Sequence, residues 1–418
     1  MMFEKVALGT VCKFFNNLRK PVTRSSRVAG EYRYFGAAGI QDYVSEYLFD
    51  GDFILVGEDG TVVTEDDQPV VQQVSGKFWA NNHAHVIQPN DMEDYNYLYF
   101  AISSTKVRDL VTGAVQPKLS MTNLKQLQIY WAEESVVRSA IGSVLRNLDS
   151  KIAANNALSK TLEDIAQTIF KSWFIDFDPV KAKMAGEKPA GMEAATAELF
   201  PDSMEESELG VIPQGWEWKS IGDIAHVIDC LHSKKPQLLS EGFPYLQLDT
   251  ISDSGVLYFE NAGRISKEDY EKWTSRIEVE GGDCLITNVG RVGAISQVPR
   301  HFKAAIGRNI TAIRPKDSRL HQSFLIVSLL SDFMKREISN KTDSGTILEA
   351  LNVKNIPKLL IPGPSTELLL EFAKVCDPIQ SQIQELHAIN VNLRKIRDSL
   401  LPRLISGELQ IPEEMLAS

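Results

Sequence analysis

The chain has 418 residues, of which 43% are hydrophobic and 24% charged, an ordinary composition for a soluble globular protein with two or three domains. No stretch approaches the ~20 apolar residues of a membrane span, and no basic and apolar signal region opens the sequence, so we expect a cytoplasmic protein without membrane contact. The net charge of −11 argues against a uniformly nucleic-acid-binding surface, and the four scattered cysteines argue against a metal site.

The charge is unevenly distributed along the chain. Residues 176–211 hold nine acidic residues against three lysines. Two windows are basic instead: residues 13–33 contain six bases and one acid, and residues 291–319 contain seven bases and one acid. Such a window is the electrostatic footprint that DNA phosphates require, although a solvated protein face is the alternative for each.

The first half of the chain predicts a compact domain followed by a long helix. Residues 1–132 alternate short β-rich runs with turn residues and contain one helical segment, which indicates an α+β domain. In residues 133–178 the apolar spacing changes to three and four, which predicts an amphipathic helix of ~60 Å that ends before Pro179. Residues 179–212 have no periodicity and are expected to form a linker or a loosely packed excursion.

The second half repeats this order. Residues 213–364 predict a second α+β domain, residues 365–406 a second long helix, and residues 407–418 a C-terminal tail. Gly113–Ile129 aligns with Gly345–Ile361, and Gly51–Val56 aligns with Gly282–Thr287. The period is far too long for a solenoid, so we expect a tandem pair of similar domains related by an approximate two-fold axis.

The two long helices are expected to bury their apolar stripes against each other. Antiparallel packing would form a coiled coil and place the globular domains at its opposite ends. A buried asparagine on each helix would set the register, although each helix could instead pair with another protein. The predicted seam consists of Leu148, Ile152, Asn155, Leu162, Ile379, Ile383, Asn390 and Leu393.

Common catalytic signatures are absent from the sequence. It contains no G-x-x-x-x-G-K-[ST] loop and no G-x-G-x-x-G fingerprint, and its histidines lack zinc-site spacing. Asp176-Phe-Asp-Pro179 only faintly matches the Asp-Pro-Pro-Tyr loop of amino-methyltransferases, because the second proline and the aromatic residue are missing. These absences indicate a binding protein without a cofactor or a bound metal.

Four segments resemble the DNA-specificity subunit of Type I restriction–modification enzymes over essentially the whole chain. They are Tyr34–Ile40 with Phe49–Gly60, Leu162–Val180, Ser207–Trp216 and Leu393–Glu408. The resemblance implies that domains 1–132 and 213–364 are target-recognition domains, which read the two halves of a bipartite duplex DNA site. It also implies a subunit without a catalytic centre that scaffolds two methyltransferase subunits, which in turn engage the restriction–translocation subunits.

The resemblance and the basic windows together suggest site residues, each with an exposed surface charge as its alternative. The candidate DNA-binding residues are Lys13, Arg19, Lys20, Arg24, Arg27, Gln116, Lys118, Lys234, Lys235, Arg291, Arg308, Asn309 and Thr346. Trp173 and Phe174 are the candidate partner-binding residues, unless they cap the helix's own core. Two other functions compete: a coiled-coil adaptor without a nucleic-acid role, and a self-contained DNA-modifying enzyme.

Overall fold

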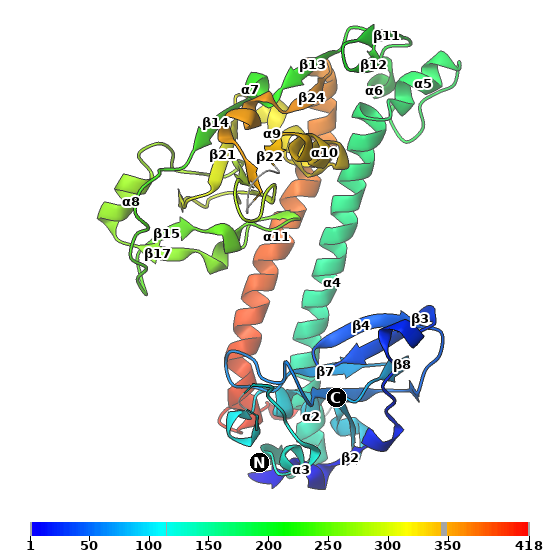
Figure 1. Ribbon diagram of the computed structural model, residues 1–418, viewed down its shortest axis with the longest axis vertical. Coiled ribbons are helices and arrows are strands. Elements are labelled where there is room, and N and C mark those ends of the chain that lie inside the picture. The colour runs from blue at the N-terminus through cyan, green and yellow to red at the C-terminus, as the bar shows by residue number, and fades with distance from the viewer. Residues whose placement is uncertain (1, 114, 344–348, 417–418) are drawn as a thin grey trace. The chain divides into compact units, whose positions relative to one another are not determined.

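The structure is a computed structural model that describes residues 2–113, 115–343 and 349–416. The chain forms two compact units, residues 1–153 with 392–418 and residues 154–391. Two helices of 40 residues contribute to both units: α4 (Ser135–Phe174) and α11 (Thr366–Ile405) (Figure 1). They correspond to the expected helices 133–178 and 365–406. In the described part of the chain, no helix is both long and apolar enough to cross a bilayer.

The first unit contains two four-stranded sheets. One has the order β2-β9-β6-β7, and the other has the order β4-β3-β8-β5, with β3 antiparallel to β4 and parallel to β8. The strands and helices of this unit are β1 (Phe3–Ala7), α1 (Leu8–Val11), β2 (Cys12–Phe14), β3 (Ala29–Gly36), β4 (Gly39–Val44), β5 (Phe49–Asp50), β6 (Phe53–Gly57), β7 (Val71–Val74), β8 (Lys77–Ala80), β9 (Ala84–Pro89), α2 (Tyr95–Ser103), α3 (Met121–Lys125) and β10 (Gln128–Ala132).

The second unit repeats this topology. One sheet has the order β14-β21-β18-β19-β16, and in the other β15 is antiparallel to β17 and parallel to β20. Its elements are β13 (Glu217–Ser220), α7 (Ile221–Ile224), β14 (Ala225–Asp229), β15 (Phe243–Leu246), β16 (Gly255–Val256), β17 (Gly263–Ile265), α8 (Lys267–Trp273), β18 (Cys284–Thr287), β19 (Ile295–Gln297), β20 (Ala305–Ile306), β21 (Ile310–Pro315), α9 (Ser318–Leu330), α10 (Asp332–Asn340), β22 (Thr342–Asp343), β23 (Ala350–Leu351) and β24 (Leu360–Gly363). The expected duplicated α+β fold is confirmed.

The central strand of each unit is buried on both faces, which explains its continuous apolar sequence. In β6, Ile54 and Val56 face a core shared with the long helices, whereas Phe53 and Leu55 face the second sheet. The equivalent strand β18 divides its side chains in the same way between two cores. Because successive side chains of the central strand point to opposite faces, this strand packs against both the second sheet and the long helices of its unit.

The long helices run antiparallel within each unit. In the second unit, the Nδ2 atom of buried Asn155 donates to the Oδ1 atom of buried Asn390 at 2.8 Å, and Phe170 packs on Phe372. In the first unit, Arg397 pairs with Asp149 at 2.6 Å. Of the other predicted seam residues, Ile152 and Ile383 are buried, and four are half-buried: Leu148, Leu162, Ile379 and Leu393.

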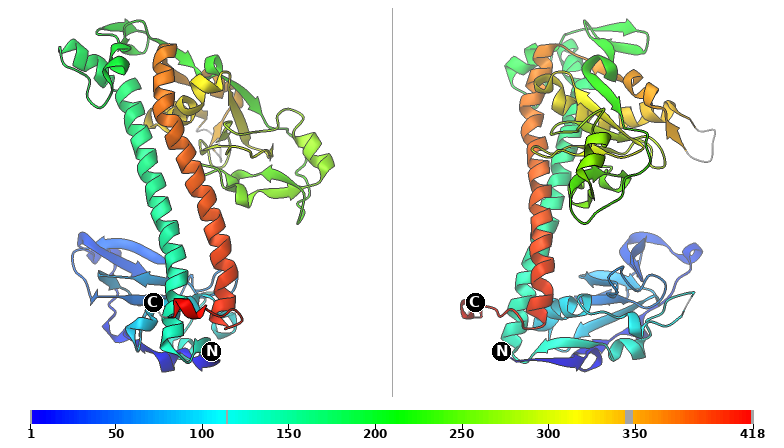
Figure 2. Two further views of the ribbon diagram at one scale, coloured as in Figure 1. Left: turned by 180° about the vertical axis from the view of Figure 1, so that it is seen from behind. Right: turned by 90° about the vertical axis from the view of Figure 1, so that its left-hand side faces the viewer.

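The first unit closes around the starting turns of α4. A Cβ atom at Gly142 would lie 2.7 Å from the backbone nitrogen of Tyr97, so only glycine lets α2 approach the helix this closely. The C-terminal tail, with Ile411 buried, joins the same core as β1, and the two chain ends lie near each other in both views of Figure 2. The tail is therefore a structural part of this unit.

Residues 179–212 differ from the expected linker. They contain α5 (Asp178–Met184), α6 (Ala194–Glu198) and a hairpin of β11 (Met204–Ser207) with β12 (Gly210–Pro213). Val180, Phe200 and Ile212 are buried in the core of the second unit. Isolated apolar anchors among acidic residues give no periodic signal, which is why the sequence pattern missed this packing.

Candidate nucleic-acid interface

In each unit three loops meet at the end of the central strand, β6 or β18, and we call this region the loop end. It contains Glu58, His83 and Leu119 in the first unit, and Asn288, Asn309 and Leu351 in the second. In the first unit, the backbone amide of Glu58, after β6, donates to the carbonyl of His83 at 2.8 Å, and that of Leu119 donates to the carbonyl of Glu58 at 2.8 Å. In the second unit, Asn288 donates to Asn309 at 2.8 Å, and Leu351 donates to Asn288 at 2.9 Å. Identical backbone bonds therefore hold together loops with different side chains.

In the first unit the centre of this loop end is the carboxylate of Glu58. It lies 2.6 Å from Arg19 and 3.5 Å from Lys118. His85 is fully buried beside it, and its ring bonds Asn16 at 2.8 Å and the carbonyl of Leu119 at 2.7 Å. Burial lowers the pKa of His85, so the ring is neutral, accepting from Asn16 and donating to Leu119. Polar bonds thus fix three loops to one another.

Two predicted DNA-binding arginines of this unit are bound within the fold. Arg19, with an 11% exposed side chain, also donates to the carbonyls of Asn82 and Ala84 at 3.3 and 2.7 Å. Arg27 pairs with Asp42 at 3.1 Å and lies over the Tyr34 ring at 4.1 Å. We therefore assign both to bracing the loops. The other candidates are exposed: Lys13 within β2, and Lys20, Arg24, Gln116 and Lys118 in loops or short turns.

The second unit places its candidates in the equivalent loops. Lys234 and Lys235 are exposed after β14, and Arg308 is exposed before β21. Asn309 is half-buried with a left-handed φ of 65°. Arg291 bonds the carbonyl of Ile251 at 2.7 Å and Asp253 at 2.5 Å, so its guanidinium is largely used within the fold. Thr346 lies outside the described residues.

Asp229, Cys230 and His232 form one group in the described chain whose donor atoms could approach a metal ion. Two features oppose binding of a cation there. Burial raises the pKa of the Cys230 thiol, and the guanidinium of Arg276 lies 3.8 Å from the Asp229 carboxylate. His232 and Asp229 already pair with each other at 2.7 Å. The group therefore fits an internal hydrogen-bonded cluster better than a metal centre.

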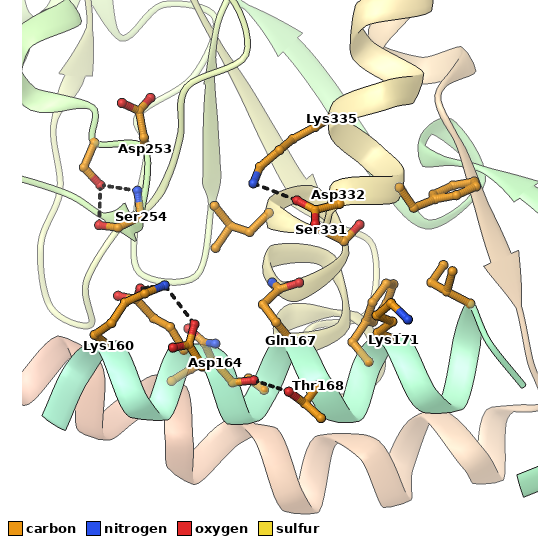
Figure 3. A pocket seen from close by; sticks show the side chains of 18 of the residues that line it. Lys160, Asp164, Gln167, Thr168, Lys171, Asp253, Ser254, Ser331, Asp332 and Lys335 are labelled. Atoms are coloured by element: carbon orange, nitrogen blue, oxygen red, sulfur yellow. Dashed lines mark hydrogen bonds and ion pairs between the residues drawn. The ribbon is translucent and has the colours of Figure 1, made fainter. Parts of the chain in front are cut away.

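A groove of about 790 Å³ lies beside α4 in the second unit, and Figure 3 shows the side chains along it. Two of its lysines are paired with neighbouring acids along its walls: Lys160 with Asp164 at 2.8 Å, and Lys335 with Asp332 at 3.0 Å. Gln167 donates to the carbonyl of Val327 at 2.9 Å. These groups do not converge on one point as catalytic groups would.

Trp173 and Phe174, predicted to bind a partner, are buried instead. Trp173 is 7% and Phe174 0% exposed, and both pack in an aromatic core. Phe174 lies 5.1 Å from the Phe372 ring and 5.2 Å from the Phe324 ring. The packed segment 179–212 supplies part of the cover through Phe200, and this contact could not be read from the helical pattern.

Comparison with known proteins assigns the family. The model of the Type I restriction modification DNA specificity domain matches residues 2–164 and 213–389. The chain is 26% identical to the HindI specificity subunit of Haemophilus influenzae over 70% of this chain and 71% of that protein. It is 25% identical to the MjaIX specificity subunit of Methanocaldococcus jannaschii over 85% of this chain and 78% of that protein.

A solved structure supports the fold. The S subunit of a Type I restriction-modification system from M. genitalium aligns with a TM-score of 0.63 and 17% identity, covering 97% of this chain and 96% of that one. Each half of the sequence thus matches the family model, and each half builds the same sheets and the same loop end. The chain belongs to the Type I restriction modification DNA specificity family and carries two copies of its domain.

Proposed function

We propose that the chain is the non-catalytic specificity subunit of a Type I restriction–modification complex, acting on DNA in the cytoplasm. Each loop end reads one half of a bipartite duplex site. The main observation in support is that the loop ends of the two units share the same pair of backbone amide–carbonyl bonds but carry different side chains. Constant backbone with variable side chains fits two related but unequal half-sites.

The non-catalytic part of the proposal is supported by the sequence and by the groove. The sequence lacks a cofactor loop, and in the groove beside α4 Lys160 pairs with Asp164 and Lys335 pairs with Asp332. Methylation and cleavage then belong to partner subunits. A self-contained modifying enzyme is the competing function, and the purified chain methylating DNA unaided would establish it.

Exchange of residues 1–132 for the first domain of another family member tests the proposal. Methylated sites would be sequenced in cells that express the chimaera with the methyltransferase subunit. We expect one half-site to change and the other to stay the same, because each loop end is built within its own unit. Simultaneous change of both half-sites would contradict independent reading. Absence of any sequence preference in the parent protein would favour an adaptor without a nucleic-acid role.

The docking sites for the methyltransferase subunits are proposed on the long helices. Leu158 and Ile165 on α4 are 45% and 43% exposed, and their repeat counterparts on α11, Ile389 and Ile396, are 45% and 48% exposed. An amphipathic helix normally buries its apolar stripe, so exposed apolar residues that recur at matched positions of the two helices support a docking surface. Two equivalent apolar pairs support two binding sites for one kind of subunit. The restriction–translocation subunits would join through these methyltransferase subunits.

Replacing Leu158 and Ile165 with serine should therefore reduce the bound methyltransferase subunits from two to one. The Ile389 and Ile396 serine variant should do the same, and the fourfold variant should bind none. Native mass spectrometry of the purified complex measures the stoichiometry. Serine substitution of the exposed hairpin residues Leu209 and Val211 is the matched control, with two subunits retained. Full occupancy in the fourfold variant would place docking elsewhere.

A further inference from the structure

We infer that one turn in each domain reads the base edges, Asn82–His83 before β9 and Arg308–Asn309 before β21; this inference rests on the proposed function. The two turns are equivalent in the repeat, because the carbonyls of His83 and Asn309 accept the same backbone bond at 2.8 Å from Glu58 and Asn288. Sequence patterns gave no reason to select Asn82 or His83. The structural equivalence selects them.

Both turns start from a rigid base. Strands β9 and β21 are each hydrogen-bonded on both sides by neighbouring strands, so the turns before them are held in place. Behind the first turn, the buried Asn81 side chain accepts from the backbone amide of His83 at 2.8 Å and donates to Gln41 at 3.2 Å. A preorganised support of this kind is what specific recognition requires.

The exposed side chains of the turns suit base recognition. Asn82 is exposed, and an asparagine amide pairs with adenine through one donor and one acceptor. Arg308 is also exposed and bonds the carbonyl of Ser233 at 2.7 Å through Nε rather than through its terminal amino groups. Those terminal groups pair with the acceptor edge of guanine. We therefore expect an adenine in the half-site of the first domain and a guanine in that of the second.

Each turn also has an exposed lysine beside it. The backbone amide of Lys20 donates to the carbonyl of Ala80, next to the first turn, at 3.3 Å. Lys234 follows Ser233, whose carbonyl accepts from Arg308 beside the second turn. Neither lysine is paired with an acid among the described residues. A base-reading turn flanked by a phosphate-binding cation is thus repeated in both domains.

The experiment uses the full chain with its methyltransferase subunits. Methylated-site sequencing of the parent complex identifies the site, and competition binding then measures duplexes substituted at each position. Asn82→Ala should lose about 5- to 150-fold discrimination at one adenine, and Arg308→Ala the same at one guanine of the other half-site. Lys20→Ala and Lys234→Ala should instead lower the salt slope by about one unit with unchanged base preference.

Arg308→Lys serves as a second variant, since it keeps the charge but removes the paired donors and should also relax the guanine preference. Asn147→Ala and Arg319→Ala alter exposed side chains of the same types away from the turns and should change nothing. Unchanged preference in Asn82→Ala and Arg308→Ala, or weakening that is equal for all sequences, would overturn the inference while the parent specificity upholds the proposed function. A parent complex without sequence preference would overturn both.

Discussion

Substitution of Arg138 with methionine should destabilise the first unit by about 3–5 kcal/mol, because it leaves a buried carboxylate unpaired. Arg138 and Asp94 pair through two bonds, at 2.7 and 3.0 Å, with side chains only 11% and 5% exposed. The guanidinium also donates to the carbonyls of Ala132 and Glu133 at 2.7 and 2.9 Å. The pair thus fastens the first turns of α4 to the preceding β10 and to α2.

Hydrogen exchange read by mass spectrometry can assign this loss to one unit. Peptides from α2 and β10 should exchange faster, and peptides from β18 and β21 should be unaffected. Arg146→Met is the matched control, since Arg146 lies on the same helix and its bond to Gln73, at 2.9 Å, is exposed to solvent. The double variant Arg138→Met with Asp94→Leu should recover much of the stability. Equal exchange in Arg138→Met and Arg146→Met would show that the buried pair contributes little.

Substitution of Phe174 with alanine should cost the second unit about 3–5 kcal/mol in the free energy of unfolding. The ring is fully buried and touches both long helices and α9, through Phe170, Phe372 and Phe324. Removing it opens a cavity that these rigid aromatic neighbours cannot fill. Thermal denaturation of the chain without partners measures the change.

Ile165→Ala provides the contrast on the same helix. Ile165 is 43% exposed, so its truncation should leave the melting temperature of the isolated chain nearly unchanged and weaken methyltransferase binding. If Phe174 instead formed a docking surface, the two variants would behave alike. If the Phe174→Ala chain were stable but bound the methyltransferase subunit less tightly, Phe174 would be a partner-binding residue, as the sequence suggested.

Local patterns in the sequence were sufficient for the architecture. A helix of 40 residues repeats its apolar positions every three or four residues, so α4 and α11 follow from spacing alone. The duplicated blocks likewise predicted two similar domains, and the matched asparagines Asn155 and Asn390 do meet in a hydrogen bond. The packing of residues 179–212 was missed because its anchors are single apolar residues without a period.

The partners of the charged residues depended on the tertiary structure. Arg19 and its carboxylate partner Glu58 are 39 positions apart, and composition could not distinguish this internal brace from a free phosphate-binding cation. Likewise, only the strand order brings the turn at Asn82 beside the loop at Glu58, as it brings Arg308 beside Ser233. The duplicated α+β fold with two long helices follows from the sequence, because periodicity is a local property. Which side chains are available to a ligand follows only from the folded chain, because availability depends on contacts made across the sheet.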